Sequence, residues 1–319
     1  MNPLRFIVIG CGHMGRRHVE KVLSLGQVEP AISLVGVADV DAEAARSVVA
    51  GHHIRATSDA RELFSEADAA IVAVPTVDHF AVVRAALEAN LDVLVEKPIA
   101  ATVAQGENLL RAARKRGRIL QVGHQEWFNP ALRIVRERIR APRFVEAHRL
   151  CFFSDRATDI DVVRDLMIHA LDIVQQLLGA APTSIDAIGI PVITHQLDIA
   201  NARLVFSNGC IANLTASRVS VTPMRKIRFF QRDGYFSIDF LSQSVAIFKR
   251  LIGDRGGAPR VELEELKTDP DDVLIAQLRA FVDAVRTRSV TGVGGSDAIG
   301  ALGTALRVID AMPSVDEFQ

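Results

Sequence analysis

Phe6-Ile-Val-Ile-Gly-Cys-Gly-His-Met-Gly15 joins an apolar run to three glycines in a Gly-x-Gly-x-x-Gly pattern. The pattern alone is weak, because glycines at this spacing occur by chance in loops. Here it follows a predicted strand and precedes a predicted helix, the context in which it binds a dinucleotide. Gly10 permits the tight turn, Gly12 lets a pyrophosphate approach the backbone, and Gly15 allows close helix–strand packing. The N–H groups and partial positive charge of the helix N-terminus are then directed at the phosphates.

The second predicted strand, Ile32–Ala38, is followed directly by Asp39. A carboxylate at this position accepts hydrogen bonds from the adenosine ribose hydroxyls and repels a 2′-phosphate, which favours NAD over NADP. The alternative is that Asp39 caps the N-terminus of the helix that follows. A further strand, predicted over 69–74, ends in Val74-Pro75-Thr76 at the edge of the sheet where cofactors bind.

Up to residue 122, short apolar runs alternate with helical stretches. The runs cover 5–9, 32–38, 69–74, 92–95 and 118–122, and the helices cover 14–25, 41–50, 59–65, 78–89 and 102–116. Buried strands that alternate with helices predict a doubly wound parallel sheet of the Rossmann type. We therefore expect an NAD-binding domain over residues 1–122.

From residue 123 to 319 the pattern changes to β-rich segments with few helices. Helices are predicted over 129–140, 161–178, 271–288 and 297–312. Asn208-Gly209 and Asp233-Gly234 predict hairpin turns between strands. We expect a substrate-binding α+β domain with a large open, mostly antiparallel sheet and helices on one face. Its other face would need cover, which predicts a homo-oligomer, a dimer or tetramer, formed through this sheet.

Three residues are candidates for catalysis. Lys97, in Glu96-Lys97-Pro98, follows the strand predicted over 92–95 and so lies at the ligand-binding edge of the sheet. Asp165 and His169 are four residues apart on a predicted helix and share one face. The alternatives are a surface lysine and a buried histidine with satisfied hydrogen bonds. Alcohol dehydrogenation needs a base, and His169 oriented by Asp165 provides one.

At this point the chain resembles the glucose–fructose oxidoreductase / inositol dehydrogenase (MocA-type) family. The resemblance rests on the glycine motif, Ala38-Asp39, Glu96-Lys97-Pro98 and Asp165-x-x-x-His169 in that order. It implies that Lys97 and His169 face the nicotinamide across an interdomain cleft, with Asp165 beside them. Combined with the motifs, it predicts cofactor contacts from Gly10, Cys11, Gly12, His13, Met14, Gly15, Asp39, Val74, Pro75, Thr76, His79, Glu96, Lys97 and Gln125.

Gly123-His-Gln-Glu-Trp-Phe-Asn-Pro130 is similar to the Gly-His-x-x-Arg-Phe-Asn-Pro stretch of family enzymes that oxidise nucleotide-linked amino sugars, such as UDP-N-acetylglucosamine at its 3-hydroxyl. Trp127 stands where these enzymes often have arginine. The resemblance implies a sugar or sugar-nucleotide substrate. Arg149, Arg156 and Arg164 are candidates to meet a diphosphate, and the alternative for each is an ion-paired surface arginine.

The formal net charge of −1 gives no sign of nucleic acid or an acidic membrane as partner. Three cysteines and the lack of a signal or membrane segment predict a cytoplasmic protein without disulfides or a metal site. The motifs predict hydride transfer between a sugar hydroxyl and NAD. Two alternatives are a dehydrogenase or reductase of a free sugar, inositol or other small carbonyl compound, and a non-catalytic NAD(P)-binding sensor.

Overall fold

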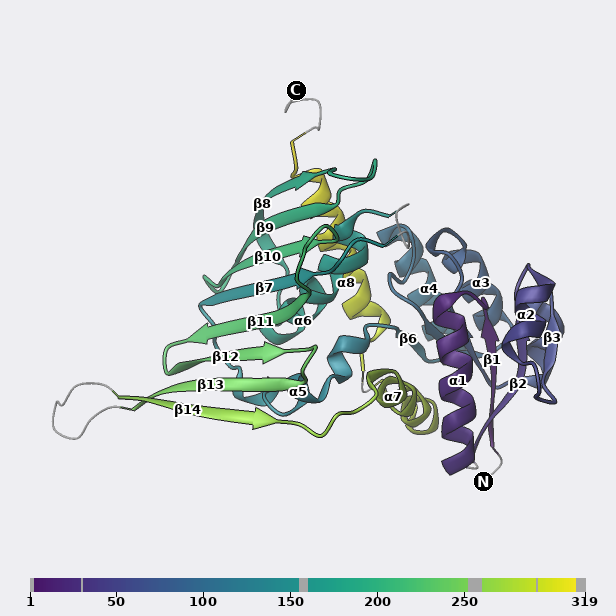
Figure 1. Ribbon diagram of the computed structural model, residues 1–319. Coiled ribbons are helices and arrows are strands. Elements are labelled where there is room, and N and C mark those ends of the chain that lie inside the picture. The colour runs from purple at the N-terminus through teal and green to yellow at the C-terminus, as the bar shows by residue number, and fades with distance from the viewer. Residues whose placement is uncertain (1–2, 30, 155–159, 252–259, 291, 314–319) are drawn as a thin grey trace. The chain divides into compact units, whose positions relative to one another are not determined.

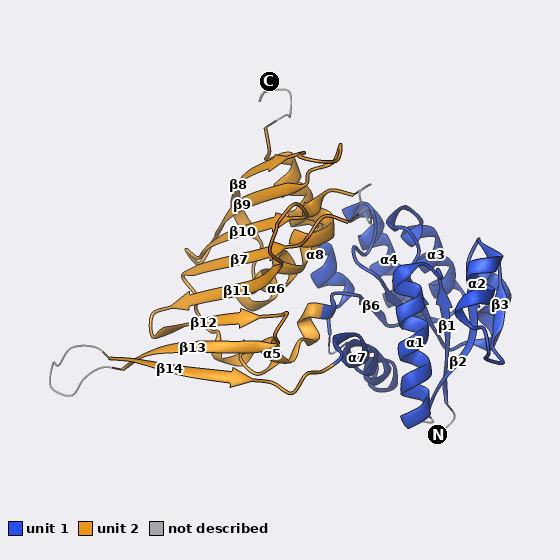
Figure 2. Ribbon diagram, in the orientation of Figure 1, with its two compact units in different colours: residues 1–125, 272–299 blue, residues 126–271, 300–319 orange. Residues whose placement is uncertain are grey.

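The chain forms two compact units in a computed structural model that describes residues 3–29, 31–154, 160–251, 260–290 and 292–313. The first unit comprises residues 1–125 and 272–299, and the second comprises 126–271 and 300–319 (Figure 2). The chain therefore passes from one unit to the other three times.

The first unit contains a six-stranded sheet in the order β3-β2-β1-β4-β5-β6, with every pair parallel. This confirms the predicted Rossmann sheet. Its central strands are buried on both faces, which explains why they read as continuous apolar runs. The strands are β1 (Leu4–Ile9), β2 (Ile32–Ala38), β3 (Arg55–Thr57), β4 (Ala69–Val72), β5 (Asp92–Val95) and β6 (Leu120–Val122). The helices are α1 (His13–Val28), α2 (Ala42–Val48), the 3₁₀ helix η1 (Ala60–Glu66), α3 (Thr76–Glu88), α4 (Val103–Arg116) and α7 (Val273–Thr287).

Helix α7 belongs to the first unit, although residues 126–271 separate it in the chain from the rest of that unit. The Phe281 ring meets Phe6 of β1 edge to face, with ring centroids 6.1 Å apart. Arg288, at the end of α7, donates to both carboxylate oxygens of Asp92 in β5, at 2.8 and 2.9 Å. The domains expected from the sequence, residues 1–122 and 123–319, meet at a single boundary, whereas the first unit also contains residues 272–299.

The second unit contains an eight-stranded sheet in the order β14-β13-β12-β11-β7-β10-β9-β8 (Figure 1). Among the described strands of this second sheet, only β7 and β10 pair in parallel, so the predicted mostly antiparallel sheet is confirmed. The strands are β7 (Phe144–Leu150), β8 (Pro182–Ile190), β9 (Ile199–Phe206), β10 (Ile211–Ser217), β11 (Met224–Gln231), β12 (Gly234–Asp239), β13 (Ser244–Leu251) and β14 (Arg260–Lys267). The helical elements are η2 (Gln125–Phe128), α5 (Pro130–Arg133), η3 (Arg136–Arg138), the π-helix η4 (Val163–Met167), α6 (Ile168–Leu178) and α8 (Gly295–Asp310), the last of which begins in the first unit.

The core of the second unit lies between one face of its sheet and its helices. In β7, Val145 and Ala147 are buried in a cluster that also contains Leu171 of α6 and Ala305 of α8. The residues that alternate with them point to the other face, where Glu146 of β7 pairs with Arg228 of β11. This alternation places helices on one face only, as expected from the sequence.

Two local details differ from the prediction. The helix predicted over 129–140 is replaced by the short turns α5 and η3, which still bury Leu132, Val135 and Ile139. Both predicted hairpin turns are present, between β9 and β10 and between β11 and β12. Gly209 has the positive φ of 78° that its turn requires, whereas the φ of Gly234 is not positive. Gly234 instead begins β12, where a Cβ atom would lie 2.1 Å from the Phe248 carbonyl oxygen, so it is needed for close strand pairing.

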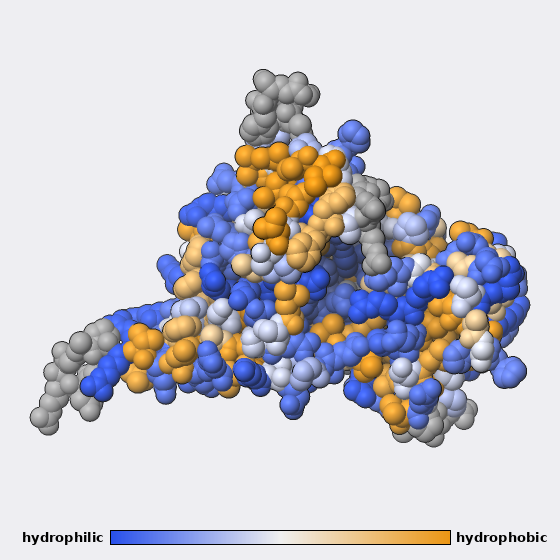
Figure 3. All heavy atoms as spheres, viewed as in Figure 1, coloured by the Kyte–Doolittle hydropathy of each residue, from blue (hydrophilic) through white to orange (hydrophobic). Residues whose placement is uncertain are grey.

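Exposed apolar side chains gather on β8 and the turn that follows it. Ile188, Ile190, Val192 and Ile193 are each 42–58% exposed. They form a hydrophobic patch at the top of the view in Figure 3. Because β8 is an edge strand, this patch borders unpaired backbone groups of the sheet.

The buried carboxylate of Asp198 closes the same turn. It accepts hydrogen bonds from the N–H groups of Val192, Ile193 and Thr194 at 2.6–2.8 Å and from the Thr194 hydroxyl at 2.8 Å. Burial alone would raise the pKa of Asp198, but these hydrogen bonds outweigh it and lower the pKa to about 2.

A folded-state pKa below the unfolded value gives stability that is present above pH 4 and is lost as the pH falls towards 2. We expect Asp198→Asn to lower the free energy of unfolding at pH 7 by about 2 kcal/mol and to flatten its decline between pH 4 and 2. Urea unfolding at several pH values measures both effects. The exposed Asp186 on β8 provides the control variant Asp186→Asn. Parallel pH curves for wild type and Asp198→Asn would contradict this role.

Candidate active site

The glycine motif forms the turn between β1 and α1, and each glycine has a distinct steric role. Gly10 has φ +92°, and a Cβ atom there would lie 2.5 Å from the Ala73 carbonyl oxygen. A Cβ on Gly15 would lie 1.8 Å from the Gly10 carbonyl oxygen. Around Gly12 no atom of the described chain lies within 4 Å of such a Cβ. The first and third glycines therefore close the turn, while the second borders open space that a pyrophosphate can enter.

The N-terminus of α1 begins at this open position. Gly12 is its N-cap residue and provides no side-chain hydrogen bond to the first turn. The first N–H groups of a helix have no partners within the helix, and they attract anions. Cys11 beside them is buried, and burial together with Asp39 raises the pKa of its thiol to about 12, so the thiol stays neutral.

Asp39 lies at the end of β2, beside the glycine turn. Its carboxylate accepts the Cys11 N–H at 2.6 Å and the Asp41 N–H at 2.9 Å. The N-cap of α2 is Asp41, which accepts the N–H groups of Glu43 and Ala44. The alternative role of Asp39 as the helix cap is therefore wrong, and its carboxylate is held where β2 meets the glycine turn.

The segment after β4 leads into α3. Strand β4 ends at Val72, two residues before the predicted end, and Pro75 is the N-cap of α3. His79 in the first turns of α3 is buried, with ring nitrogens 2.8 Å from the Pro98 carbonyl oxygen and 2.9 Å from that of Val74. Burial lowers the pKa of His79. The ring thus ties the end of β4 to the segment that carries Lys97.

Glu96 and Lys97 follow β5. Glu96 is buried; its Oε1 accepts a hydrogen bond from His18 Nε2 of α1 at 2.8 Å, and its Oε2 accepts the Lys97 N–H at 3.3 Å. Burial would raise the pKa of Glu96, but His18 and the charge of Lys97 lower it below its usual value. His124 nearby is also buried, and burial with the charge of Lys97 lowers its pKa to about 3. Glu96 and His79 therefore hold the backbone on either side of Lys97 through these hydrogen bonds.

Asp165 and His169 lie in the second unit. Asp165 belongs to the π-helix η4, and His169 lies in the first turn of α6 with 5% exposure. The sequence predicted one continuous helix here, and the π-helical turn is a local change that is frequent at functional sites. Asp172, one turn further along α6, accepts a hydrogen bond from Gln176.

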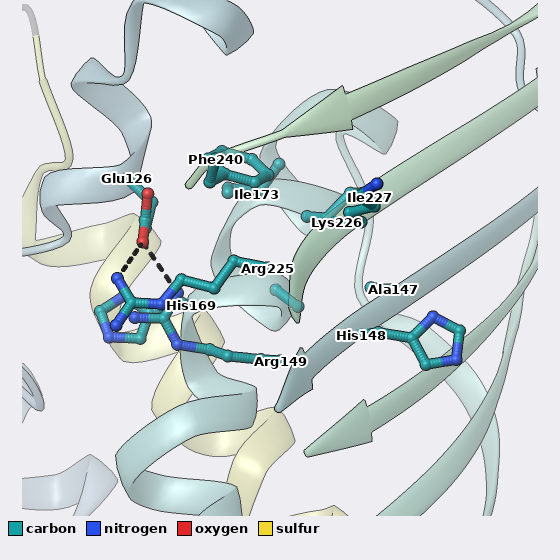
Figure 4. A pocket seen from close by; sticks show the side chains of 11 residues that line it. Glu126, Ala147, His148, Arg149, His169, Ile173, Arg225, Lys226, Ile227 and Phe240 are labelled. Carbon is teal, nitrogen blue, oxygen red and sulfur yellow. Dashed lines mark hydrogen bonds and ion pairs between the residues drawn. The ribbon is translucent and has the colours of Figure 1, made fainter. Parts of the chain in front are cut away.

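His169 lines a small pocket that is formed within the second unit. Arg149 of β7 and Arg225 of β11 converge there on Glu126 of η2, as Figure 4 shows. Arg149 Nη1 donates to Glu126 Oε1 at 2.8 Å, and Arg225 Nη1 lies 3.8 Å from the same oxygen. The floor of the pocket is apolar and includes Ala147, Ala170, Ile173, Ile227 and Phe240.

The predicted site residues therefore form two groups. The glycine turn, Asp39, residues 74–79, Glu96, Lys97 and Gln125 belong to the first unit, and Asp165 and His169 to the second. Among the arginines, Arg164 pairs with Asp161, Arg149 is mostly buried against Glu126, and Arg156 lies outside the described residues. Sequence reasoning did not single out His18, Glu126 or Arg225. Glu126 lies inside the Gly123–Pro130 motif, which is the one sequence signal that could have identified it.

Within the described ranges, no group of three His, Cys, Asp or Glu side chains could hold a metal ion. None of the helices in those ranges combines the length and apolar character that a bilayer crossing requires.

A Rossmann sheet with this glycine turn, joined to an α+β unit with a buried histidine in a pocket, defines a class of dinucleotide-dependent oxidoreductases. Residues 4–124 match the family described as "Oxidoreductase family, NAD-binding Rossmann fold", and residues 132–237 match the GFO/IDH/MocA C-terminal domain. The chain belongs to the GFO/IDH/MocA family and is an NAD-dependent oxidoreductase.

Individual relatives match over nearly the whole chain. UDP-N-acetylglucosamine 3-dehydrogenase from Acidithiobacillus ferrooxidans is 37% identical over 309 residues, 97% of each chain. A solved structure of that enzyme superposes with a TM-score of 0.90 at 35% identity, covering 99% of both chains. Inositol 2-dehydrogenase from Burkholderia multivorans is 27% identical over 98% of this chain and 94% of its own.

Proposed function

We propose that this protein oxidises the 3-hydroxyl of UDP-N-acetylglucosamine with NAD⁺. The observation that carries the proposal is the 37% identity to an enzyme named for that reaction, over 97% of both chains. The Gly123–Pro130 segment supports it, because it resembles enzymes that oxidise nucleotide-linked amino sugars. A sugar-type substrate is also consistent with the inositol dehydrogenases among the relatives.

The residues of the first unit fit NAD. The space beside Gly12 and the N-terminus of α1 suit the pyrophosphate, and the Asp39 carboxylate suits the adenosine ribose hydroxyls. We propose that residues 74–76, His79, Glu96, Lys97 and Gln125 make the remaining contacts with the cofactor. When bound, NAD⁺ supplies the hydride acceptor.

The protein must then manage the proton of the hydroxyl. We propose that His169 accepts this proton as general base and that Lys97 hydrogen-bonds the same oxygen and stabilises its developing negative charge. Asp165 would orient the imidazole and favour its charged form. An ordinary lysine is protonated at neutral pH, which favours the histidine as the base. Glu96, held by His18, fixes the backbone N–H of Lys97 and so its position.

A substrate panel tests the proposed function. The protein is incubated with NAD⁺ and UDP-N-acetylglucosamine, other UDP-sugars, free hexoses or inositols, and the absorbance of NADH is followed. We expect the highest kcat/KM with UDP-N-acetylglucosamine. Activity on a free polyol without activity on any UDP-sugar would contradict UDP-N-acetylglucosamine as the substrate, but it would not contradict membership of the family. NAD binding without turnover on the whole panel would favour the non-catalytic sensor.

The preference for NAD over NADP tests the role of Asp39. We expect Asp39→Asn to narrow this preference by at least about tenfold, because the neutral amide no longer repels a 2′-phosphate. The amide oxygen can still accept the Cys11 N–H and so hold the glycine turn, whereas the hydrogen bond from the Asp41 N–H to the other carboxylate oxygen is lost. The ratio of kcat/KM for the two cofactors measures the change. An unchanged ratio would contradict contact between Asp39 and the ribose.

We also propose a homo-oligomer formed through the C-terminal sheet. The exposed apolar residues on edge strand β8 support an association surface there. Light scattering after size-exclusion chromatography tests it, with a dimer or tetramer expected and a monomer as the contrary result. The cytoplasmic location stays a prediction.

A further inference from the structure

Gln121 of β6 is a glutamine inside the first unit with no exposed surface. Neither the amide nitrogen nor the amide oxygen of its side chain has a hydrogen-bond partner among the described residues. Burying an amide without hydrogen bonds costs free energy, so nearly all such groups bond to protein or to ordered water. The groups beside Gln121 therefore indicate what its amide binds.

The buried carboxylate of Glu96 lies next to Gln121. Leu94 of β5 and Gln121 of β6 are register partners, and the ladder continues with a hydrogen bond from the Gly123 N–H to the Val95 carbonyl oxygen at 2.8 Å. A Cβ atom on Gly123 would lie 3.0 Å from Glu96 Oε2, so position 123 points to the face of the sheet that carries this carboxylate. Because side chains alternate along a strand, Gln121 points to the same face. The amide and the carboxylate are thus one pleat apart, about 7 Å along the strand.

The Glu96 carboxylate has more acceptor sites than the described residues fill. An ionised carboxylate offers about four such sites. Oε1 accepts from His18, and Oε2 accepts the Lys97 N–H at 3.3 Å, longer than the usual N–H···O distance. Because the pKa of Glu96 is lowered, this buried group is ionised at neutral pH and gains from a further donor. Two hydrogen bonds of about 2.8 Å through one water molecule span about 5.6 Å, which suits two groups one pleat apart.

We propose that Gln121 is a positioning residue for Lys97 and acts through a buried water that joins its amide to Glu96 Oε2. The inference rests on the proposed function only in the role given there to Lys97. Buried waters bond to polar groups that would otherwise lack partners, and they form part of the structure. His18 holds Oε1 and the water holds Oε2, so both oxygens of the carboxylate are fixed, and with them the backbone N–H of Lys97.

Crystal structures of the wild-type protein and of Gln121→Met test the water directly, because methionine has a similar length and no donor. In wild type we expect an ordered water within about 3.2 Å of both the Gln121 amide and Glu96 Oε2. In the variant we expect no water there, and the 3.3 Å distance from Oε2 to the Lys97 nitrogen should lengthen beyond about 3.5 Å. Gln121→Met should also unfold at a lower urea concentration. Removal of an amide that has no partner would instead leave the urea midpoint unchanged or raise it.

Steady-state kinetics test the effect on Lys97, with whichever substrate the panel above shows to be oxidised. We expect Gln121→Met to lower kcat at least about tenfold, because a small displacement of a group that contacts the reacting atoms slows the reaction. The KM of the substrate and the Kd of NAD⁺ should stay within about twofold. Calculating kcat per titrated NAD⁺ site ensures that an unfolded fraction does not lower it. Gln121→Asn keeps an amide for the water and should restore kcat to within about threefold of wild type.

Gln105→Met is the matched control. Gln105 of α4 also has a buried amide oxygen without a partner among the described residues. Helix α4 covers the opposite face of the sheet, because a Cβ on Gly295 would lie 3.1 Å from Leu110 of α4 and 3.7 Å from Leu120, whose side chain alternates with that of Gln121. Its kcat should stay within about twofold of wild type.

The outcomes separate this inference from the proposed function. Absence of the water in wild type, a urea midpoint that does not fall in Gln121→Met, or an equal loss of kcat in Gln105→Met overturns the inference. Turnover by wild type with an unchanged kcat in Gln121→Met also overturns it and leaves the proposed function in place. If wild type oxidises no substrate of the panel, the proposed function fails, whereas the two crystal structures still decide whether Gln121 positions Lys97.

Discussion

Replacing His169 with alanine is expected to lower kcat about 100- to 10,000-fold, the usual contribution of a general base. His169 is buried in the pocket of the second unit, so the substitution removes the imidazole without removing a surface charge. Binding of NAD⁺ should change less than twofold, because the glycine turn and Asp39 belong to the first unit. Stopped-flow measurement of NADH formation and fluorescence titration of NADH give the two quantities.

Lys97→Ala is the companion variant that separates base from charge stabiliser. If His169 is the base, the pH dependence of kcat/KM should lose its acidic limb in His169→Ala and keep it in Lys97→Ala. His169→Gln keeps the size of the side chain and serves as the control for packing. Near-normal turnover in His169→Ala together with loss of turnover in Lys97→Ala would make Lys97 the base and contradict our assignment.

The glycine motif offers the second large effect, through two alanine variants with opposite consequences. Gly15→Ala would place a Cβ 1.8 Å from the Gly10 carbonyl oxygen, so we expect a loss of stability of about 3 kcal/mol or more. Gly12→Ala meets no atom of the described chain within 4 Å, and its cost in stability should stay within about 1 kcal/mol. The added methyl group instead occupies the space proposed for the pyrophosphate, so the Kd for NAD⁺ should rise at least about tenfold.

Urea unfolding and NADH titration distinguish these two effects. Gly51→Ala on the surface of the same unit, where φ is +84° and the space is open, serves as the control for glycine strain alone. A stable Gly15→Ala, or a Gly12→Ala variant with normal NAD⁺ affinity, would show that the turn between β1 and α1 does not have the geometry described above.

Sequence reasoning was most successful where one short segment determines the structure. The apolar run before Gly10 and the alternation of runs and helices predicted the parallel sheet, because central strands buried on both faces are necessarily apolar. β3, with only three residues, carries no periodic pattern. β14 is an exposed edge strand with many charged residues, so its sequence resembles a loop.

Features built from distant segments could not be predicted. Arg288 pairs with Asp92 across 196 residues, and no local pattern indicates that α7 returns to the first unit. Arg149 and Arg225 become neighbours only through the register of β7 and β11. The motifs around Lys97 and His169 identify candidate residues, whereas the pocket depends on Glu126, whose partners lie 23 and 99 positions away in the chain.

The most direct test of the account is transfer of deuterium from UDP-N-acetylglucosamine labelled at carbon 3. The wild-type protein is incubated with this substrate and NAD⁺, and the reduced cofactor is analysed by mass spectrometry and NMR. We predict one deuterium at C4 of the nicotinamide. Reduced cofactor without deuterium, or no reduction of NAD⁺ by this substrate while a free polyol reduces it, would contradict the proposed reaction.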